Sequence, residues 1–292
     1  MHVADKLGHR YDDWYLWVWT HDAPICRLYT MPRPYGPVTN RGLCNLPPPP
    51  PGYDPTHFAA GDVVWDPVSR LFYSTRLGRT NTNSGQPTFL IKSSDGVNWS
   101  YVRSDPIVSP GNGTYDGYQT AYGRFLRDPW GNLRRVGGRT LWFYRGERRD
   151  PQEYRVGLAV STDMVNFSKH SPVPRFNPLN GALFSLGSAL MVNGNTYLLL
   201  SAPLLGLLGG GSVKGGPSLM FLKQANVSGD PYQWSDGPGI PIFIDLRSLA
   251  YTDGGSYYID PETGIHRFAY ANVENITGPQ RFAVQTAIAP LI

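Results

Sequence analysis

Charged residues are scarce in this sequence: they make up 16% of the 292 residues, and the formal net charge is only +4. Proteins that bind nucleic acids gather Lys and Arg on one face, whereas the basic residues here are scattered along the chain. The longest apolar stretch, Thr196 to Gly211, is broken by Pro203 and by glycines. A membrane-spanning helix needs about 20 consecutive apolar residues. We therefore expect no nucleic-acid partner and no membrane span.

Cysteine is almost missing as well, since Cys26 and Cys44 are the two examples in the chain. The sequence shows no spacing of Cys or His that is typical of a metal site, so we expect no metal ligands of this kind. Two interpretations of the cysteine pair are open. The thiols either form a disulfide in an oxidising compartment or remain two ordinary free thiols.

Glycine, proline and aromatic residues are what the sequence has in abundance. The chain contains 33 Gly and 27 Pro, and 13% of its residues are aromatic. Alternating apolar and polar residues between turn signals predict short strands along the whole chain, and no stretch predicts a convincing helix. The composition and the pattern together predict an all-β protein.

An internal repeat supports this prediction. The segments IKSSDGVNWSYVRSDPIVSP (residues 91–110) and AVSTDMVNFSKHSPVPRFNP (residues 159–178) align without a gap, and Asp95 falls on Asp163. Asp side chains cap tight turns by accepting hydrogen bonds from the backbone that follows them. We therefore predict a structural, turn-capping role for both aspartates and no catalytic role.

The same order of strands and turns recurs along the chain. The expected second strands of each unit are 14–20, 71–76, 140–146, 196–201 and 266–272, and the expected third strands are 25–31, 89–93, 156–161, 218–225 and 281–287. The spacing between units suits one four-stranded propeller blade with its loops. We predict a single domain, 1–292, folded as a five-bladed β-propeller with blades at about 1–46, 53–110, 115–178, 182–245 and 246–292.

Several of these strands resemble those of a known family. The phrases YLWVWTHD (15–22), FLIKSSDGVNW (89–99) and AVSTDMVNFSKH (159–170) are similar to blade strands of glycoside hydrolase family 43 and its propeller relatives among the arabinanases, xylosidases and fructosidases. The resemblance covers essentially the whole chain. It implies an inverting glycosidase that hydrolyses arabinose-, xylose- or fructose-type glycans in an axial funnel. An oligosaccharide or polysaccharide is then the partner, the location is extracellular or surface-exposed, and no cofactor is needed beyond a possible structural cation on the axis.

The resemblance also implies a general base. In the family this base is an Asp on the first strand of blade one, about ten residues before a Tyr-rich second strand. Asp5 is ten residues before Tyr15, although Lys6 stands where the family has proline. Asp5 is therefore the predicted general base.

Two further carboxylates are carried over in the same way. The phrase FAAGDVVWDPVSRLFY (58–73) resembles the start of the family's second blade and places Asp62 on the axis. The phrase TYDGYQTAYGRF (114–125) offers Asp116 as the residue that orients the acid. We expect Asp5, Asp62 and Asp116 to converge on one pocket, with Arg124 as a candidate compensating cation.

The general acid departs from the family pattern. Counting back from the turn glycine Gly194 places Ser185 where the family has Glu, and serine does not protonate a leaving group at neutral pH. Glu147, Glu153 and Asp253 are alternative acids, although none matches the motif. The second hypothesis is therefore a carbohydrate-binding or structural propeller, such as a surface or virion component, that has lost the acid.

Other polar and aromatic side chains are candidates for contacts with sugar rings. A structural histidine and an aromatic ring packed between blades are the alternative interpretations for members of this set. The predicted substrate contacts are His21, His57, Trp65, Tyr118, Arg124 and Asp253.

Overall fold

The computed structural model describes residues 14–19, 25–32, 37–111, 115–170, 183–203, 218–226, 230–237, 239–245, 253–259, 263–273 and 282–288. Within these ranges the regular secondary structure is β-strand throughout. This result confirms the all-β prediction. Among the described residues we find no helix of the length and apolarity that a membrane span requires.

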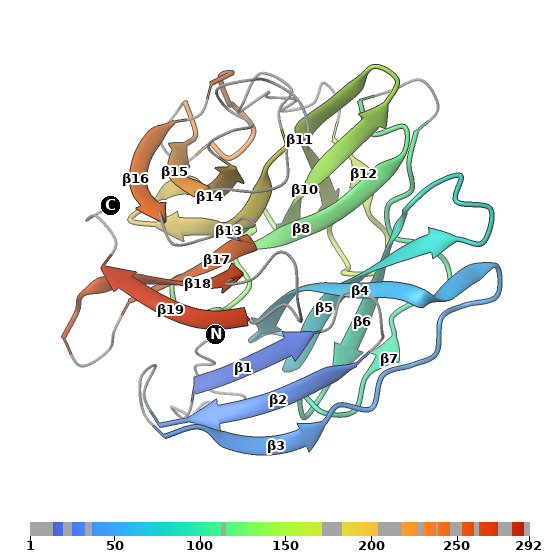
Figure 1. Ribbon diagram of the computed structural model, residues 1–292, viewed down its shortest axis with the longest axis horizontal. Coiled ribbons are helices and arrows are strands. Elements are labelled where there is room, and N and C mark those ends of the chain that lie inside the picture. The colour runs from blue at the N-terminus through green and yellow to red at the C-terminus, as the bar shows by residue number, and fades with distance from the viewer. Residues whose placement is uncertain are drawn as a thin grey trace.

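The strands form four hydrogen-bonded sheets (Figure 1). The first is β1 (Trp14–Trp19), β2 (Cys26–Met31) and β3 (Thr39–Leu43), and the second is β4 (Tyr53–Asp66), β5 (Leu71–Thr80), β6 (Thr88–Ser93) and β7 (Ser100–Tyr101). The third runs β12 (Ser168–Lys169), β11 (Gln152–Ser161), β10 (Arg139–Arg149), β8 (Gln119–Arg127), β13 (Ser185–Val192), β14 (Asn195–Pro203), β15 (Ser218–Gln224) and β16 (Ile240–Asp245), with β9 (Arg135–Val136) beside β10. The fourth is β17 (Asp253–Ile259), β18 (His266–Val273) and β19 (Phe282–Ile288).

All ten strands predicted from the repeat overlap a strand of the structure. The predicted second strands correspond to β1, β5, β10, β14 and β18, and the predicted third strands correspond to β2, β6, β11, β15 and β19. In each pair the two strands are antiparallel neighbours. The alternation of apolar residues between turn signals therefore located these elements correctly.

The core lies between neighbouring groups of strands. One cluster joins Val64 and Leu90 of the second sheet to Phe125 and Trp142 of β8 and β10. A second cluster packs β10 and β11 against β13 and β14, and a third packs β1 and β2 against β4 and β5. Because each group buries its faces against its neighbours, the strands are apolar on both faces.

The nine-stranded sheet contains two antiparallel groups that meet at the centre of the molecule. β8 and β13 pair in parallel through Leu126 with Ala189 and Arg127 with Leu190. In Figure 1 the strand groups follow one another around the molecule in chain order, as in a propeller. The division into five blades stays a prediction, and the predicted closure between the chain ends involves residues outside the described ranges.

The repeated turn has the predicted structure in both copies. One carboxylate oxygen of Asp95 accepts hydrogen bonds from the backbone N–H groups of Val97 and Asn98, each at 2.8 Å. Asp163 accepts the same pair of bonds from Val165 and Asn166, each at 2.8 Å. The turn-capping prediction is therefore confirmed for both aspartates.

The two cysteines are free thiols on neighbouring strands. The backbone N–H of Cys44 donates to the carbonyl of Cys26 at 2.8 Å. A hydrogen bond between the two thiols and burial raise the pKa of Cys26, while the same bond lowers the pKa of Cys44. The structure thus corresponds to the free-thiol alternative.

Candidate functional site

Several strand ends meet at one edge of the molecule. Since β8 and β13 run parallel, they begin at the same edge, at Gln119 and Ser185. Glu147, near the end of β10, lies opposite Gln119 in the antiparallel pair of β10 and β8. Gln86, after β5, forms a parallel bridge with Gln119. We call this region, defined by Gln86, Gln119, Glu147 and Ser185, the strand-start edge.

A chain of polar side chains follows the strand-start edge. Arg145 donates from Nη2 to Oε1 of Gln119 at 2.8 Å, and Gln119 donates to Oε1 of Gln86. Gln86 then donates to the hydroxyl of Tyr118 at 3.0 Å, which donates to Oδ1 of Asn83 at 2.7 Å. Each donor after Arg145 also accepts from the preceding group, so the chain has a single direction. The side chains are therefore held in fixed orientations.

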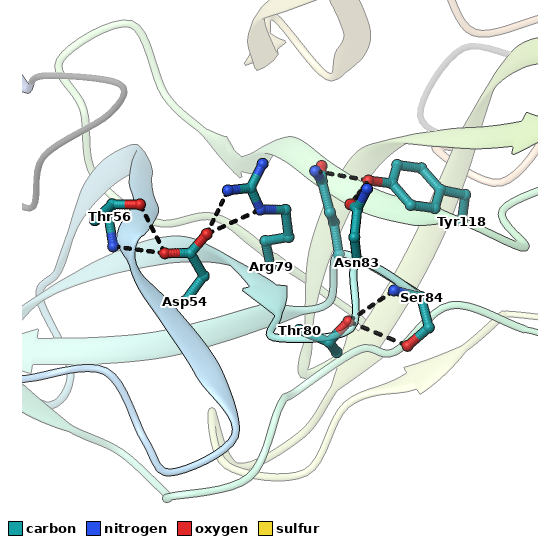
Figure 2. A network of polar contacts seen from close by, with 8 residues as sticks. Asp54, Thr56, Arg79, Thr80, Asn83, Ser84 and Tyr118 are labelled. Carbon is teal, nitrogen blue, oxygen red and sulfur yellow. Dashed lines mark hydrogen bonds and ion pairs between the residues drawn. The ribbon is translucent and has the colours of Figure 1, made fainter.

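Figure 2 shows the outer end of this chain. The hydroxyl of Tyr118 points toward Asn83, which follows the end of β5. The guanidinium of Arg149 lies 3.3 Å from the centroid of the Tyr118 ring, and the Arg149 side chain is exposed. Nearby, Arg79 forms an ion pair with Asp54 (Figure 2). A cation over an aromatic ring and a row of amides and hydroxyls suit a ligand rich in hydroxyl groups.

Arg145 is the cation at the inner end of the chain. Its side chain is buried between the rings of Tyr122 and Tyr154, whose centroids lie 4.4 Å and 5.3 Å from the guanidinium carbon. Nη1 donates to the carbonyl of Phe184 at 3.0 Å, and Nε finds no hydrogen-bond partner within the described ranges. Because Phe184 directly precedes Ser185, Arg145 connects β10 to the start of β13.

Glu147 lies on the same face of β10 as Arg145. Its side chain is 9% exposed, and among the described residues its carboxylate has no hydrogen-bond or ion-pair partner. It lies opposite Tyr154 in the register of β10 and β11. Burial raises the pKa of the Tyr154 hydroxyl, and the charge of Glu147 raises it further. In the described part of the chain, Glu147 is thus a buried carboxylate at the strand-start edge without a bound counter-ion.

Asp62, a predicted catalytic residue, is held by the strand next to it. Its carboxylate forms an ion pair with Arg127 at 2.9 Å and accepts a hydrogen bond from the N–H of Phe125 at 3.2 Å. Arg127 also donates to the hydroxyl of Ser188 at 2.9 Å. This buried contact joins β4, β8 and β13. The cation that compensates Asp62 is therefore Arg127 rather than the expected Arg124.

Asp116 is held by a different set of strands. Its carboxylate lies 2.6 Å from Nζ of Lys169 in β12 and accepts a hydrogen bond from the hydroxyl of Tyr144 in β10 at 2.9 Å. These are the outer strand of the sheet and a strand between it and β8, whereas the ion pair of Asp62 is with β8. The ion pairs of Asp62 and Asp116 therefore tie the two carboxylates to different parts of the molecule.

The remaining predicted contacts have varied positions. Trp65 is 1% exposed and packs against Phe72, with ring centroids 4.8 Å apart. A ring without an exposed face cannot stack on a sugar, which contradicts its predicted role. Arg124 donates to the carbonyl of Gly187 at 2.8 Å and so connects β8 to β13, while His57 lies half-buried in β4.

Two predicted residues, Asp5 and His21, lie outside the described residues, and Asp253 begins β17. Glu153, an alternative acid, forms ion pairs with Arg148 at 2.7 Å and Arg155 at 2.5 Å. Within the described ranges no three His, Cys, Asp or Glu side chains gather as a metal site would require. The absence of a cofactor stays a prediction.

Sequence analysis missed three members of the polar chain: Gln86, Gln119 and Arg145. Gln and Arg are common surface residues, and no short motif surrounds these three. Arg145 belongs to the basic segment RGERRD (145–150), which suggests a solvated loop, although β10 extends to Arg149. The strict alternation of β10 after Phe143 was the available signal that Arg145 and Glu147 share an inward face.

The structure is similar to several solved structures. The complex of BT0996 with RGII matches with a TM-score of 0.67 and 12% identity over 96% of this protein and 85% of the other. An exo-1,5-alpha-L-arabinanase from a bovine ruminal metagenomic library matches with a TM-score of 0.63 and 14% identity over 95% of this protein and 90% of the other. A thermostable family-43 glycoside hydrolase matches with a TM-score of 0.62 and 14% identity over 96% and 86% of the two proteins.

This chain has the fold of the propeller glycoside hydrolases. No family model matches the sequence, and the search of curated proteins found no match. At 12–14% identity the likeness extends to the fold and not to individual side chains. The roles of residues in this glycoside-hydrolase-type propeller therefore have to follow from its own geometry.

Proposed function

We propose that this protein is a glycosidase that hydrolyses glycosidic bonds of arabinose-, xylose- or fructose-type glycans at the strand-start edge. The observation that carries the proposal is the hydrogen-bond chain from Arg145 to Asn83 in a fold shared with glycoside hydrolases over almost the whole chain. Oriented amides and hydroxyls bind sugar hydroxyls, and Tyr118 adds an aromatic ring.

Hydrolysis with inversion needs two carboxyl groups. One activates a water molecule on one side of the sugar, and the other protonates the leaving oxygen. Asp5 is the proposed base, by its position in the sequence. Asp62 and Asp116 act in this proposal by supporting the site, because ion pairs with Arg127 and Lys169 occupy their carboxylates.

The test is a screen of aryl glycosides and polysaccharides built from these sugars, at several pH values, on the purified protein and its Asp5→Asn variant. We expect turnover by the parent and its loss in the variant, with unchanged circular dichroism. Turnover by both proteins at equal rates would remove Asp5 as the base. Lack of turnover by the parent on every substrate would contradict the glycosidase proposal.

A second candidate is a carbohydrate-binding propeller without catalysis. The observation that favours it is Ser185, which begins β13 with a buried side chain where the resemblance implies a glutamate. Calorimetric titration with the same polysaccharides separates the two candidates. Binding that releases no reducing sugar supports the binding protein, and release of reducing sugar supports the enzyme.

The proposed partner is an oligosaccharide or polysaccharide. Such glycans are found mainly outside cells, so we also propose an extracellular or surface-exposed location. Detection of the intact protein in the culture medium or on the cell surface of its source would test this part of the proposal.

A further inference from the structure

The proposed reaction lacks an identified proton donor, because Ser185 begins β13. We propose that Glu147, from the second strand of the neighbouring group, supplies the carboxyl group that protonates the leaving oxygen. This inference rests on the proposed function and names a residue of the same site.

The alternation of β10 places Glu147 beside the start of β13. The register between β10 and β11 is regular from Thr140 to Arg149, so Phe143, Arg145 and Glu147 share one face. Phe143 packs in the core cluster shared with β13 and β14, and Arg145 donates to the carbonyl of Phe184. Two residues along a strand advance about 6.6 Å, so Glu147 lies one such step beyond this contact, toward the strand-start edge.

The surroundings of Glu147 distinguish it from the other carboxylates of this region. Asp62, Asp116, Glu153 and Asp54 are all bound by Arg or Lys side chains. The Glu147 carboxylate has no such partner among the described residues, although burial of an unpaired charge is unfavourable. A carboxyl group that no structural contact occupies is free to give a proton to a bound substrate and to take it back.

The step balances as follows. The carboxyl proton of Glu147 passes to the glycosidic oxygen while the bond from that oxygen to the anomeric carbon breaks, and the leaving group departs as an alcohol. Water adds its oxygen to the anomeric carbon and loses a proton to the base, leaving Glu147 as a carboxylate. Exchange of one proton with solvent restores both groups.

The experiment compares Glu147→Gln with Glu153→Gln, a matched variant at the next carboxylate of the same hairpin. Both are assayed on alkyl glycosides, whose leaving groups need a proton, and on 2,4-dinitrophenyl glycosides, whose leaving group does not. General acid catalysis contributes about 10²–10⁴-fold. We expect Glu147→Gln to lose at least about 100-fold on alkyl glycosides, less than about 10-fold on dinitrophenyl glycosides, and the basic limb of its pH profile.

Equal losses by Glu147→Gln on both substrate classes, or full activity on both, would overturn the assignment while hydrolysis by the parent keeps the proposed function intact. A parent without turnover would overturn both proposals. Thermal unfolding of each variant checks folding. If Glu147→Gln does not fold, Glu147→Asp provides the second measurement: it keeps the carboxyl group, and we expect it to retain the basic limb that the assignment requires.

Discussion

Two carboxylates lie on opposite faces of β10 and differ in their surroundings. Asp116 lies on the face of Tyr144 and Gly146, where it binds the Tyr144 hydroxyl and Lys169. Glu147 lies on the other face and has no bound partner in the described part of the chain. A carboxylate whose oxygens are occupied stabilises the fold, whereas an unoccupied one costs stability and is available for chemistry. Stability and activity should therefore depend on different faces of one strand.

The largest effect on stability should come from Arg127, the partner of Asp62. Arg127→Met leaves a buried carboxylate without its cation, and breaking a buried ion pair costs about 3–5 kcal/mol. Urea denaturation should show this loss. The control is the double variant Asp62→Leu, Arg127→Met, which removes both charges and should recover part of the stability. Equal stability of the parent and the single variant would show that the pair contributes nothing.

Asp116→Ala should have the next largest effect. It removes an ion pair with the half-exposed Lys169 and the hydrogen bond from Tyr144, so we expect a loss of about 2–3 kcal/mol. Glu147→Gln removes no bound partner that the described residues supply and should change the free energy of unfolding by less than about 1 kcal/mol. Urea denaturation of the two variants compares these losses. If they lose the same stability, the distinction between the faces of β10 does not hold.

Crowding on the Asp116 face gives a smaller effect. A Cβ atom at Gly157 would lie 2.4 Å from the Tyr144 ring and 2.5 Å from the Tyr115 hydroxyl. Gly157→Ala should therefore destabilise the protein by about 1–3 kcal/mol, as overpacking of cores does. Gly85→Ala is the matched control, because the nearest atom would lie at 3.4 Å, an ordinary contact. Similar thermal midpoints for the two variants would contradict this packing.

The repeated turns should show the smallest effects. Backbone hydrogen bonds from Asn166 and Val165 hold the pKa of Asp163 well below its usual value. Because the folded pKa is the lower one, the stabilisation is complete above the unfolded pKa of about 3.9 and is lost as the pH falls through the folded pKa. Asp163→Ala should cost about 1 kcal/mol at pH 7, as loss of a cap does.

Unfolding measured from neutral to strongly acid pH checks this prediction. The difference between the parent and Asp163→Ala should shrink toward acid pH. Asp95→Ala, the same change in the other copy of the turn, should behave alike, because burial opposes the low pKa of Asp95 but its hydrogen bonds outweigh burial. A difference that grows in acid would contradict the role of these carboxylates.

The positions of the strands and turns could be predicted from the sequence, because they depend on neighbours along the chain. Alternation of apolar residues located ten strands, and the two SxDxVN phrases identified two turns with the same hydrogen bonds. The resemblance of blade phrases indicated the propeller glycoside hydrolase fold that the structure shares. Each of these features is local or repeats locally.

The partners of the polar side chains depend on contacts between strand groups, and here the tertiary structure decided. A bulge at Tyr122, with a φ of 50°, shifts the register of β8. Beyond it, Arg124 and Arg127 are three positions apart and face opposite sides, so Arg127 reaches Asp62 while Arg124 reaches Gly187. No periodicity in the sequence shows which blade faces which arginine, because that depends on how whole sheets pack together.

The same reason separates Trp65 from Glu147. Both lie in strands whose existence the sequence determined by itself, through alternation and turn residues. Only the packing of one sheet on the next buried the Trp65 ring against Phe72 and left the Glu147 carboxylate, among the described residues, unpaired beside the start of β13. Burial and pairing are properties of surfaces that meet from distant parts of the chain, and a linear pattern does not contain them.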